Sequence, residues 1–135
     1  MDASYAVQLI VPAEAGSARL ARLVAAALAA DADFTIDETE DLRVAVSELV
    51  ALLVEGGDEG DKLDDQVTLT YHRGDDSVEV AGARARRDGV DSSSDGATPD
   101  DLALEILRVV VDEHHYEHDG NGRHFRLLKR ARADA

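Results

Sequence analysis

The stretch that decides the fold is DLRVAVSELV, residues 41–50. Apolar residues recur there every three or four positions, which is the spacing of one face of an α-helix. The same face continues past the stretch, and its members are Leu42, Ala45, Val46, Leu49, Leu52 and Leu53. Asp37, with Glu40 as its capping-box partner, predicts the start of this helix, and Gly56-Gly57 predicts its end. The pattern therefore predicts a long amphipathic helix that packs one side against a core.

The sequence on both sides of this helix predicts a second layer made of strands. Residues 4–11 alternate between apolar and polar and predict a half-buried strand. One hairpin is predicted to join residues 66–72 to 77–83, and another to join 115–118 to 123–129. The order is strand, helix, helix, two strands, helix, two strands. This order predicts an α+β two-layer sandwich, a mostly antiparallel mixed sheet covered on one face by about three helices.

Caps and apolar faces can be assigned for the remaining elements. Ser17 is expected to cap the first helix, which runs to about Ala30, and Thr98-Pro99-Asp100-Asp101 predicts the start of the last helix. The first helix is expected to bury a stripe of Leu20, Leu23, Val24, Ala27 and Leu28. The first hairpin is expected to turn Val67, Leu69, Tyr71, Val78 and Val80 toward the core.

Two segments are rich in Gly, Asp and Ser and are predicted to be loops, residues 56–62 and 87–97. The second is long enough to form a flexible, lid-like loop. A chain of 135 residues suits one core. We therefore expect a single domain over residues 1–135.

The composition is strongly acidic, because 14 Lys and Arg stand against 29 Asp and Glu, a net charge of −15. Nucleic acids and anionic membranes attract basic surfaces, so we expect neither as a direct partner. A basic protein partner suits this charge. The absence of Cys excludes disulfides and thiol chemistry. No apolar run is long enough to span a membrane and no signal-peptide pattern follows Met1, which predicts a cytoplasmic protein.

With this order of elements, residues 41–50 resemble the start of the N-box helix of the histidine-kinase-like (GHKL, Bergerat-fold) ATPases. The most similar branch is the anti-sigma factor serine-protein kinases, in which such a leader runs into Ser-Glu-x-x-x-Asn. Residues 19–24, 106–116 and 120–127 resemble that family's first helix, its last helix with the following strand, and its final hairpin. The resemblance covers residues 4–130 and implies the two-layer fold of that family.

The three nucleotide-binding motifs of the family are all altered. The resemblance places Leu52 where the family has the Asn that coordinates magnesium, and Leu offers no oxygen ligand. Residues 82–86, Gly-Ala-Arg-Ala-Arg, replace Asp-x-Gly-x-Gly, whose Asp binds the adenine amino group. Residues 99–102, Pro-Asp-Asp-Leu, replace Gly-x-Gly-Leu, so that two carboxylates would repel phosphates at a helix N-terminus. The resemblance implies a degenerate domain, and we expect no bound cofactor or metal.

The resemblance matches two residues, Glu48 and Arg22, to functional positions of the family. Glu48 matches the general base of the family. We interpret it as vestigial, because a general base has no phosphoryl transfer to assist without the magnesium and phosphate sites. The alternative is an ordinary helix residue. Arg22, with Arg19 beside it, lies on the helix whose Arg contacts the sigma factor or its antagonist. Both are candidate partner-binding residues, and the alternative is a pair of solvated arginines.

Two polar clusters have competing interpretations. His114 and His118 would share one face of a strand while His115 faces the other, which disfavours a metal site and favours surface groups that titrate near neutral pH. The second cluster is basic and comprises Arg84, Arg86 and Arg87. It is either the charged base of the 87–97 loop, neutralised by nearby aspartates, or an anion site of a new design.

Three functions stay open at this point. The first is an anti-sigma factor of the partner-switching type, which sequesters a sigma factor by binding alone and is released by a STAS-type anti-anti-sigma protein. The second is an active or residual ATP-dependent serine kinase of that STAS partner, acting through Glu48. The third is a small-molecule-sensing or dimerisation module, and assembly into a homodimer is left open for all three. The lost nucleotide motifs favour the first, a binding protein rather than an enzyme, but do not identify the sigma factor or the signal.

Overall fold

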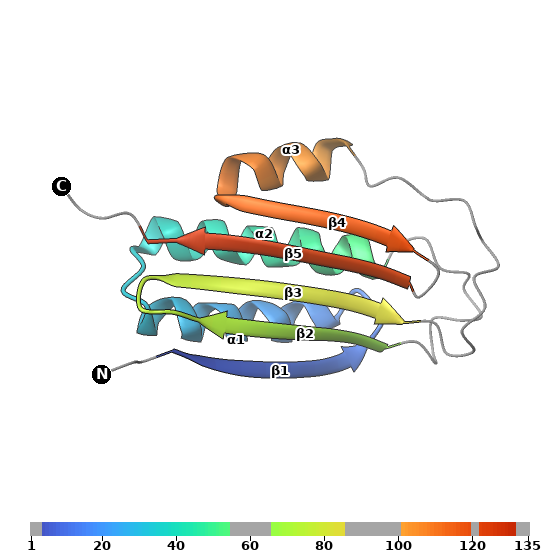
Figure 1. Cartoon of the computed structure of the whole chain (residues 1–135), viewed down its shortest axis with the longest axis horizontal. Coiled ribbons are helices and arrows are strands. Elements are labelled where there is room, and N and C mark those ends of the chain that lie inside the picture. Colours follow the sequence, from blue (N-terminus) through green and yellow to red (C-terminus); the bar gives the residue numbers. More distant parts are fainter. Residues whose placement is uncertain (1–3, 55–65, 86–100, 120–121, 132–135) are drawn as a thin grey trace.

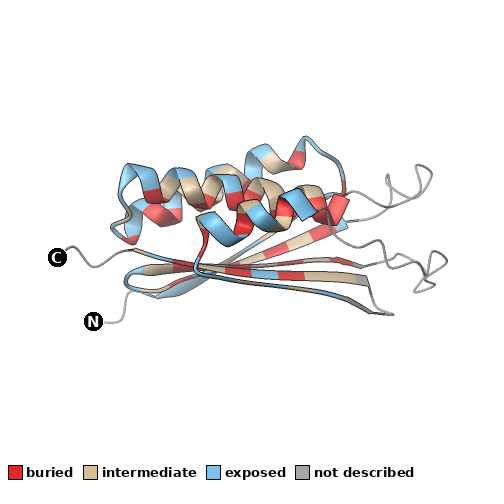
Figure 2. Cartoon of the chain, turned by 90° about the horizontal axis from the view of Figure 1, so that it is seen from above, coloured by how far each residue is buried: buried red, intermediate tan, exposed pale blue. Residues whose placement is uncertain are grey.

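A five-stranded antiparallel sheet carries three helices on one face in the computed structural model, which describes residues 4–54, 66–85, 101–119 and 122–131 (Figures 1 and 2). The strands are β1 (Tyr5–Pro12), β2 (Gln66–Arg73), β3 (Ser77–Ala85), β4 (Glu113–Asp119) and β5 (Gly122–Arg130). The helices are α1 (Ser17–Asp31), α2 (Ile36–Val54) and α3 (Asp101–Val110). This architecture confirms the predicted fold class.

The strand order in the sheet is β1-β2-β3-β5-β4. Every neighbouring pair of described strands is antiparallel, so the expectation of a mixed sheet was wrong in that detail. The predicted loops at 56–62 and 87–97 and the predicted cap at 98–100 lie outside the described residues. Within the described ranges, no helix is long and apolar enough to cross a membrane.

The core lies between the sheet and the three helices, with α2 as its largest contributor. The predicted α2 face is confirmed, since all six of its members are buried: Leu42, Ala45, Val46, Leu49, Leu52 and Leu53. The five residues predicted to point inward from the first hairpin are also buried: Val67, Leu69, Tyr71, Val78 and Val80. Strict alternation on β2 and β3 therefore places one face of the sheet under α2.

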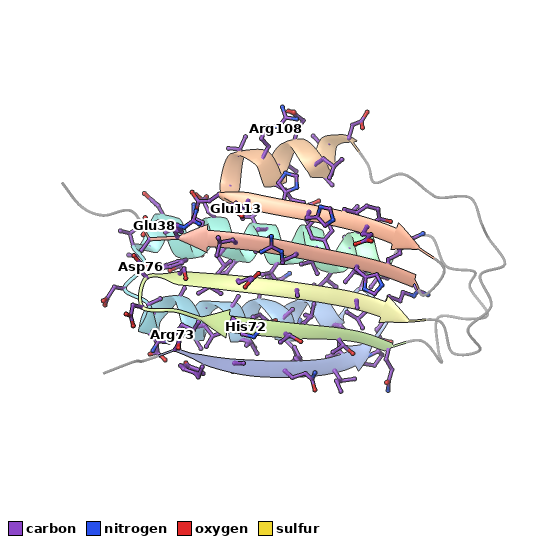
Figure 3. The ribbon with its side chains drawn as sticks, viewed as in Figure 1. Glu38, His72, Arg73, Asp76, Arg108 and Glu113 are labelled. Atoms are coloured by element: carbon purple, nitrogen blue, oxygen red, sulfur yellow. The ribbon has the colours of Figure 1, made fainter. Side chains whose placement is uncertain are left out.

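Two predicted helix caps were wrong. The capping box of α2 is formed by Thr35 and Glu38: the Thr35 amide donates to Glu38 Oε1 at 2.8 Å, and the Glu38 amide donates to Thr35 Oγ1 at 3.1 Å. Figure 3 shows Glu38 at this end of α2. The helix thus starts before Asp37, and the predicted partner Glu40 instead pairs with Arg43 at 2.9 Å. Ser17 is the first residue of α1, and its hydroxyl donates to the Pro12 carbonyl at 2.8 Å.

The buried face of α1 also differs from the prediction. Leu20 and Leu23 are 50% and 60% exposed, whereas the buried side of the helix consists mostly of alanines. Its members are Ser17, Ala21, Ala25, Leu28 and Ala29. Small side chains let a helix approach its neighbours closely, so the mostly alanine face packs and Leu20 and Leu23 are left at the surface. Of the rest of the predicted stripe, Leu28 is buried, Val24 is half-buried and Ala27 is exposed. On α3, Leu102 and Val109 are likewise 66% and 80% exposed, and Ala103 and Leu107 are buried.

The Tyr71 hydroxyl joins the sheet to α1 by donating to the Ala21 carbonyl at 3.0 Å. Tyr71→Phe should lower the unfolding free energy by about 1–2 kcal/mol at pH 7, because the buried hydrogen bond from the phenol to the Ala21 carbonyl is lost. Burial raises the pKa of Tyr71 above that of an ordinary tyrosine. The neutral Tyr71 phenol therefore contributes fully to the free energy of unfolding below pH ~10, and this contribution falls as the pH rises above that value. Urea unfolding should show that the free energy of unfolding falls more between pH 8 and pH 10.5 in the parent than in Tyr71→Phe. Equal decreases would contradict the buried hydrogen bond between Tyr71 and Ala21.

Candidate functional site

The C-terminal half of α2 holds two of the positions that the family resemblance singled out. Glu48 is half-buried, and Leu52, one turn later, is buried. The Leu52 carbonyl accepts a hydrogen bond from Arg123 Nη1 on β5 at 3.0 Å. The residue at the expected magnesium position thus offers an aliphatic side chain and a carbonyl that a guanidinium already binds.

Gly82 on β3 lies directly beneath α2. A Cβ atom at this position would lie 2.7 Å from Leu49 Cδ2, 2.8 Å from Leu53 Cδ1 and 2.9 Å from Leu69 Cδ2. Real Cβ atoms essentially never come this close to other heavy atoms. Leucine side chains therefore fill the space on the helix side of Gly82, where the resemblance would place the adenine.

The Arg84 side chain on β3 lies at the C-terminal end of α2. Its side chain is buried, and Nη1 donates to the Leu53 carbonyl at 3.0 Å and the Val54 carbonyl at 2.7 Å. The last carbonyls of a helix have no partner within the helix, and a cation there also interacts favourably with the helix dipole. Arg84 and Arg123 therefore cap the C-terminus of α2. This contact with α2 is a role of Arg84 that the sequence analysis did not predict; Arg86 and Arg87, the other members of the basic cluster, lie outside the described residues.

The two candidate partner-binding arginines lie together on α1. Arg19 is exposed, while Arg22 is half-buried and donates through Nη1 to Ser47 Oγ on α2 at 3.0 Å. Arg22 is thus held in place by α2 rather than freely solvated. A shallow surface hollow of about 410 Å³ lies at this end of α1 and is lined by Ala15, Gly16, Ala18, Arg19, Leu20 and Arg22. The sequence analysis missed the exposed leucines beside these arginines, because it assigned them to the core.

The first two histidines of β4, His114 and His115, point to opposite faces of the sheet. His114 is half-buried and its ring stacks on Phe125 at a centroid distance of 6.5 Å, whereas His115 is exposed, with Nε2 3.8 Å from Glu117 Oε1. The predicted alternation of these two residues is therefore confirmed; the His118 side chain lies outside the description. In the part of the chain that the structure describes, no group of three His, Asp or Glu side chains could hold a metal ion.

A family model described as "Histidine kinase-like ATPase domain" matches residues 11–129. The chain belongs to this family. The family includes the anti-sigma factor serine kinases. The match covers every described helix and strand in full except β1, of which only the last two residues are matched, and β5, which lacks only Arg130. No curated protein matches the chain.

ATP and magnesium are the ligands that a histidine kinase-like ATPase domain implies, and the described residues do not fit them. Leu52 supplies no side-chain oxygen for magnesium, and three leucines occupy the space over Gly82. Arg123 binds the Leu52 carbonyl, and Arg84 binds the Leu53 and Val54 carbonyls. The arrangement holds α2 firmly on the sheet but leaves no place for adenine at Gly82.

Proposed function

We propose that this histidine kinase-like ATPase domain is an anti-sigma factor of the partner-switching type. It sequesters a sigma factor in the cytoplasm by protein–protein contact, without ATP, and a STAS-type anti-anti-sigma protein releases it by competing for the domain. The observation that carries the proposal is the packing at Gly82, where the fold of an ATPase is kept while leucines fill the adenine position.

The exposed side of α1 is the binding surface in this proposal. Arg19 and Arg22 lie beside the exposed Leu20 and Leu23. Arginine is enriched among interface hot spots, and the two leucines add apolar area that a partner can bury. The net charge of −15 suits a partner that is basic because it binds DNA, and it accelerates the encounter.

Arg19→Glu should weaken binding of the sigma factor at least tenfold, because it removes an interface arginine and puts a like charge against the acidic group of the partner with which that arginine pairs. The thermal unfolding midpoint should not change, since Arg19 is exposed. The measurement is surface plasmon resonance with the sigma factor that co-purifies with the domain from its native cell. Arg108→Glu is the matched control, because Arg108 is an exposed arginine on α3, which is separated from α1 by α2 in the helix layer (Figures 1 and 3). Equal affinities for the two variants, or native co-purification of neither a sigma factor nor a STAS protein, would contradict the proposal.

A further inference from the structure

We propose that Ser47 on α2 is a positioning residue for partner binding, because its hydroxyl oxygen holds the Arg22 guanidinium beside the hollow on α1 before a partner arrives. The inference rests on the proposed function and adds to it a residue that acts through Arg22 rather than by touching the partner. Ser47 thereby decides which way one of the two α1 arginines points.

The contact between Arg22 and Ser47 joins two neighbouring helices. Arg22 Nη1 donates to Ser47 Oγ at 3.0 Å, and both residues are half-buried. The two helices, α1 and α2, lie side by side on the sheet (Figure 1). Ser47 follows the buried Val46 by one residue, so it lies about 100° around α2 from Val46, at the margin of the face that packs on the core. The Arg22 guanidinium is therefore held at the seam between the helices.

The charge of Arg22 stays available, because Ser47 is a neutral acceptor. An arginine has five N–H donors, and the Ser47 oxygen takes one of them. Arg22 forms no ion pair with any described residue, although the chain contains 29 Asp and Glu. Four other arginines do pair with a carboxylate, and these pairs are Arg43–Glu40, Arg108–Glu105, Arg126–Glu79 and Arg130–Glu113. Ser47 thus orients Arg22 without neutralising it, which leaves the charge and the remaining donors for a partner.

The two arginines of the hollow differ in how they are held. Arg19 and Arg22 both line the hollow of about 410 Å³ on α1. Arg19 is exposed, and its side chain makes no hydrogen bond or ion pair with a described residue. Fixing a long side chain on binding weakens the affinity by about two- to tenfold. Arg22 is already fixed by Ser47, so it contributes to binding without this loss.

The backbone of α1 does not depend on the contact with Ser47. The buried alanine side of α1 packs in the core, and the Tyr71 hydroxyl donates to the Ala21 carbonyl at 3.0 Å. Loss of the Ser47 oxygen should therefore free the Arg22 side chain and leave the helix in place. A merely structural link between the helices would instead loosen α1 itself when the oxygen is lost.

The first measurement compares Ser47→Thr with Ser47→Val, because these side chains have the same branched shape and differ in the hydroxyl. Nuclear magnetic resonance of the arginine Nε–H groups should show an ordered Arg22 and a mobile Arg19 in the parent and in Ser47→Thr. In Ser47→Val, Arg22 should become as mobile as Arg19, while backbone hydrogen exchange along α1 stays the same. The same Arg22 mobility in the two variants, or faster exchange along α1 in Ser47→Val alone, would overturn the proposal.

The second measurement is surface plasmon resonance with the sigma factor that co-purifies with the domain. Ser47→Val should weaken the affinity about three- to tenfold, and Ser47→Thr should stay within about twofold of the parent. In an Arg22→Ala background the two variants should bind equally, because Ser47 then has no side chain to position. If Ser47→Val disturbs the packing of α2, Ser47→Ala removes the same oxygen and suits a helix.

Equal affinities of Ser47→Val and Ser47→Thr with Arg22 present would overturn the positioning role alone. The same difference between them in the Arg22→Ala background would also overturn it, since Ser47 would then act without Arg22. A parent chain that binds no sigma factor would overturn the proposed function, and the positioning role with it. The two failures are therefore distinguishable.

Discussion

Gly82→Asp is expected to unfold the domain, even though it restores the acidic residue that the family uses to bind adenine. The new Cβ would meet three leucine methyl carbons at 2.7–2.9 Å, so the α2–sheet contact would have to open. The carboxylate would also be buried among apolar side chains, while Arg84, two residues along on the same face of β3, already binds the carbonyls of Leu53 and Val54. Overpacking costs about 1–3 kcal/mol, and burial of an unpaired polar or charged group adds several more. This sum approaches the whole stability of a typical domain, about 5–15 kcal/mol.

Circular dichroism and urea unfolding measure this effect, with Gly82→Ala and Ala83→Asp as controls. Gly82→Ala should lose only about 1–3 kcal/mol, because it adds the clash without the charge. Ala83 is the next residue of β3 and points to the open face of the sheet, so Ala83→Asp should cost less than about 1 kcal/mol. Calorimetry with millimolar magnesium-ATP should show no binding to the parent chain. A folded Gly82→Asp variant that bound ATP would show that the leucines can withdraw from the adenine position.

The fold could be predicted where the spacing of apolar residues allows only one face of a helix or strand to pack against the core. The α2 stripe has one apolar face, and the alternation on β2 and β3 fixes which residues point inward, so both were confirmed. On α1 both faces are apolar, and periodicity cannot decide whether leucines or alanines pack. The α2 cap was displaced because Thr35-x-x-Glu38 and Asp37-x-x-Glu40 match the same short pattern.

The candidate site was predictable only where it depends on local sequence. Leu52 and Gly82 could be assigned from the order of motifs, and the structure explains them by packing. The capping of α2 by Arg84 and Arg123 could not be anticipated, because each arginine is at least 30 residues from the carbonyl it binds. A run of arginines looks the same in a sequence whether its side chains point to solvent or to the end of a helix.

Arg84→Met should lower the unfolding free energy by about 2–4 kcal/mol. Methionine keeps most of the apolar bulk but removes both hydrogen bonds to the Leu53 and Val54 carbonyls, and each bond to a charged donor contributes about 1.5–3 kcal/mol in a non-additive way. Urea unfolding measures the loss, and hydrogen exchange should quicken in the last turn of α2. Arg84→Lys should recover only part of the stability, because a lysine cannot reproduce the planar fork of donors.

Arg43→Met is the matched control, because Arg43 forms an exposed pair with Glu40 three residues away and should cost less than about 0.5 kcal/mol. The same variants separate the two interpretations of Arg84. If the Arg84 guanidinium caps α2, inorganic phosphate should leave the unfolding midpoint of the parent unchanged. Arg84→Met should then be less stable than the parent, with or without phosphate. If Arg84→Met were as stable as Arg43→Met, and phosphate raised the midpoint of the parent alone, Arg84 would be an anion-binding residue and the capping role would be wrong.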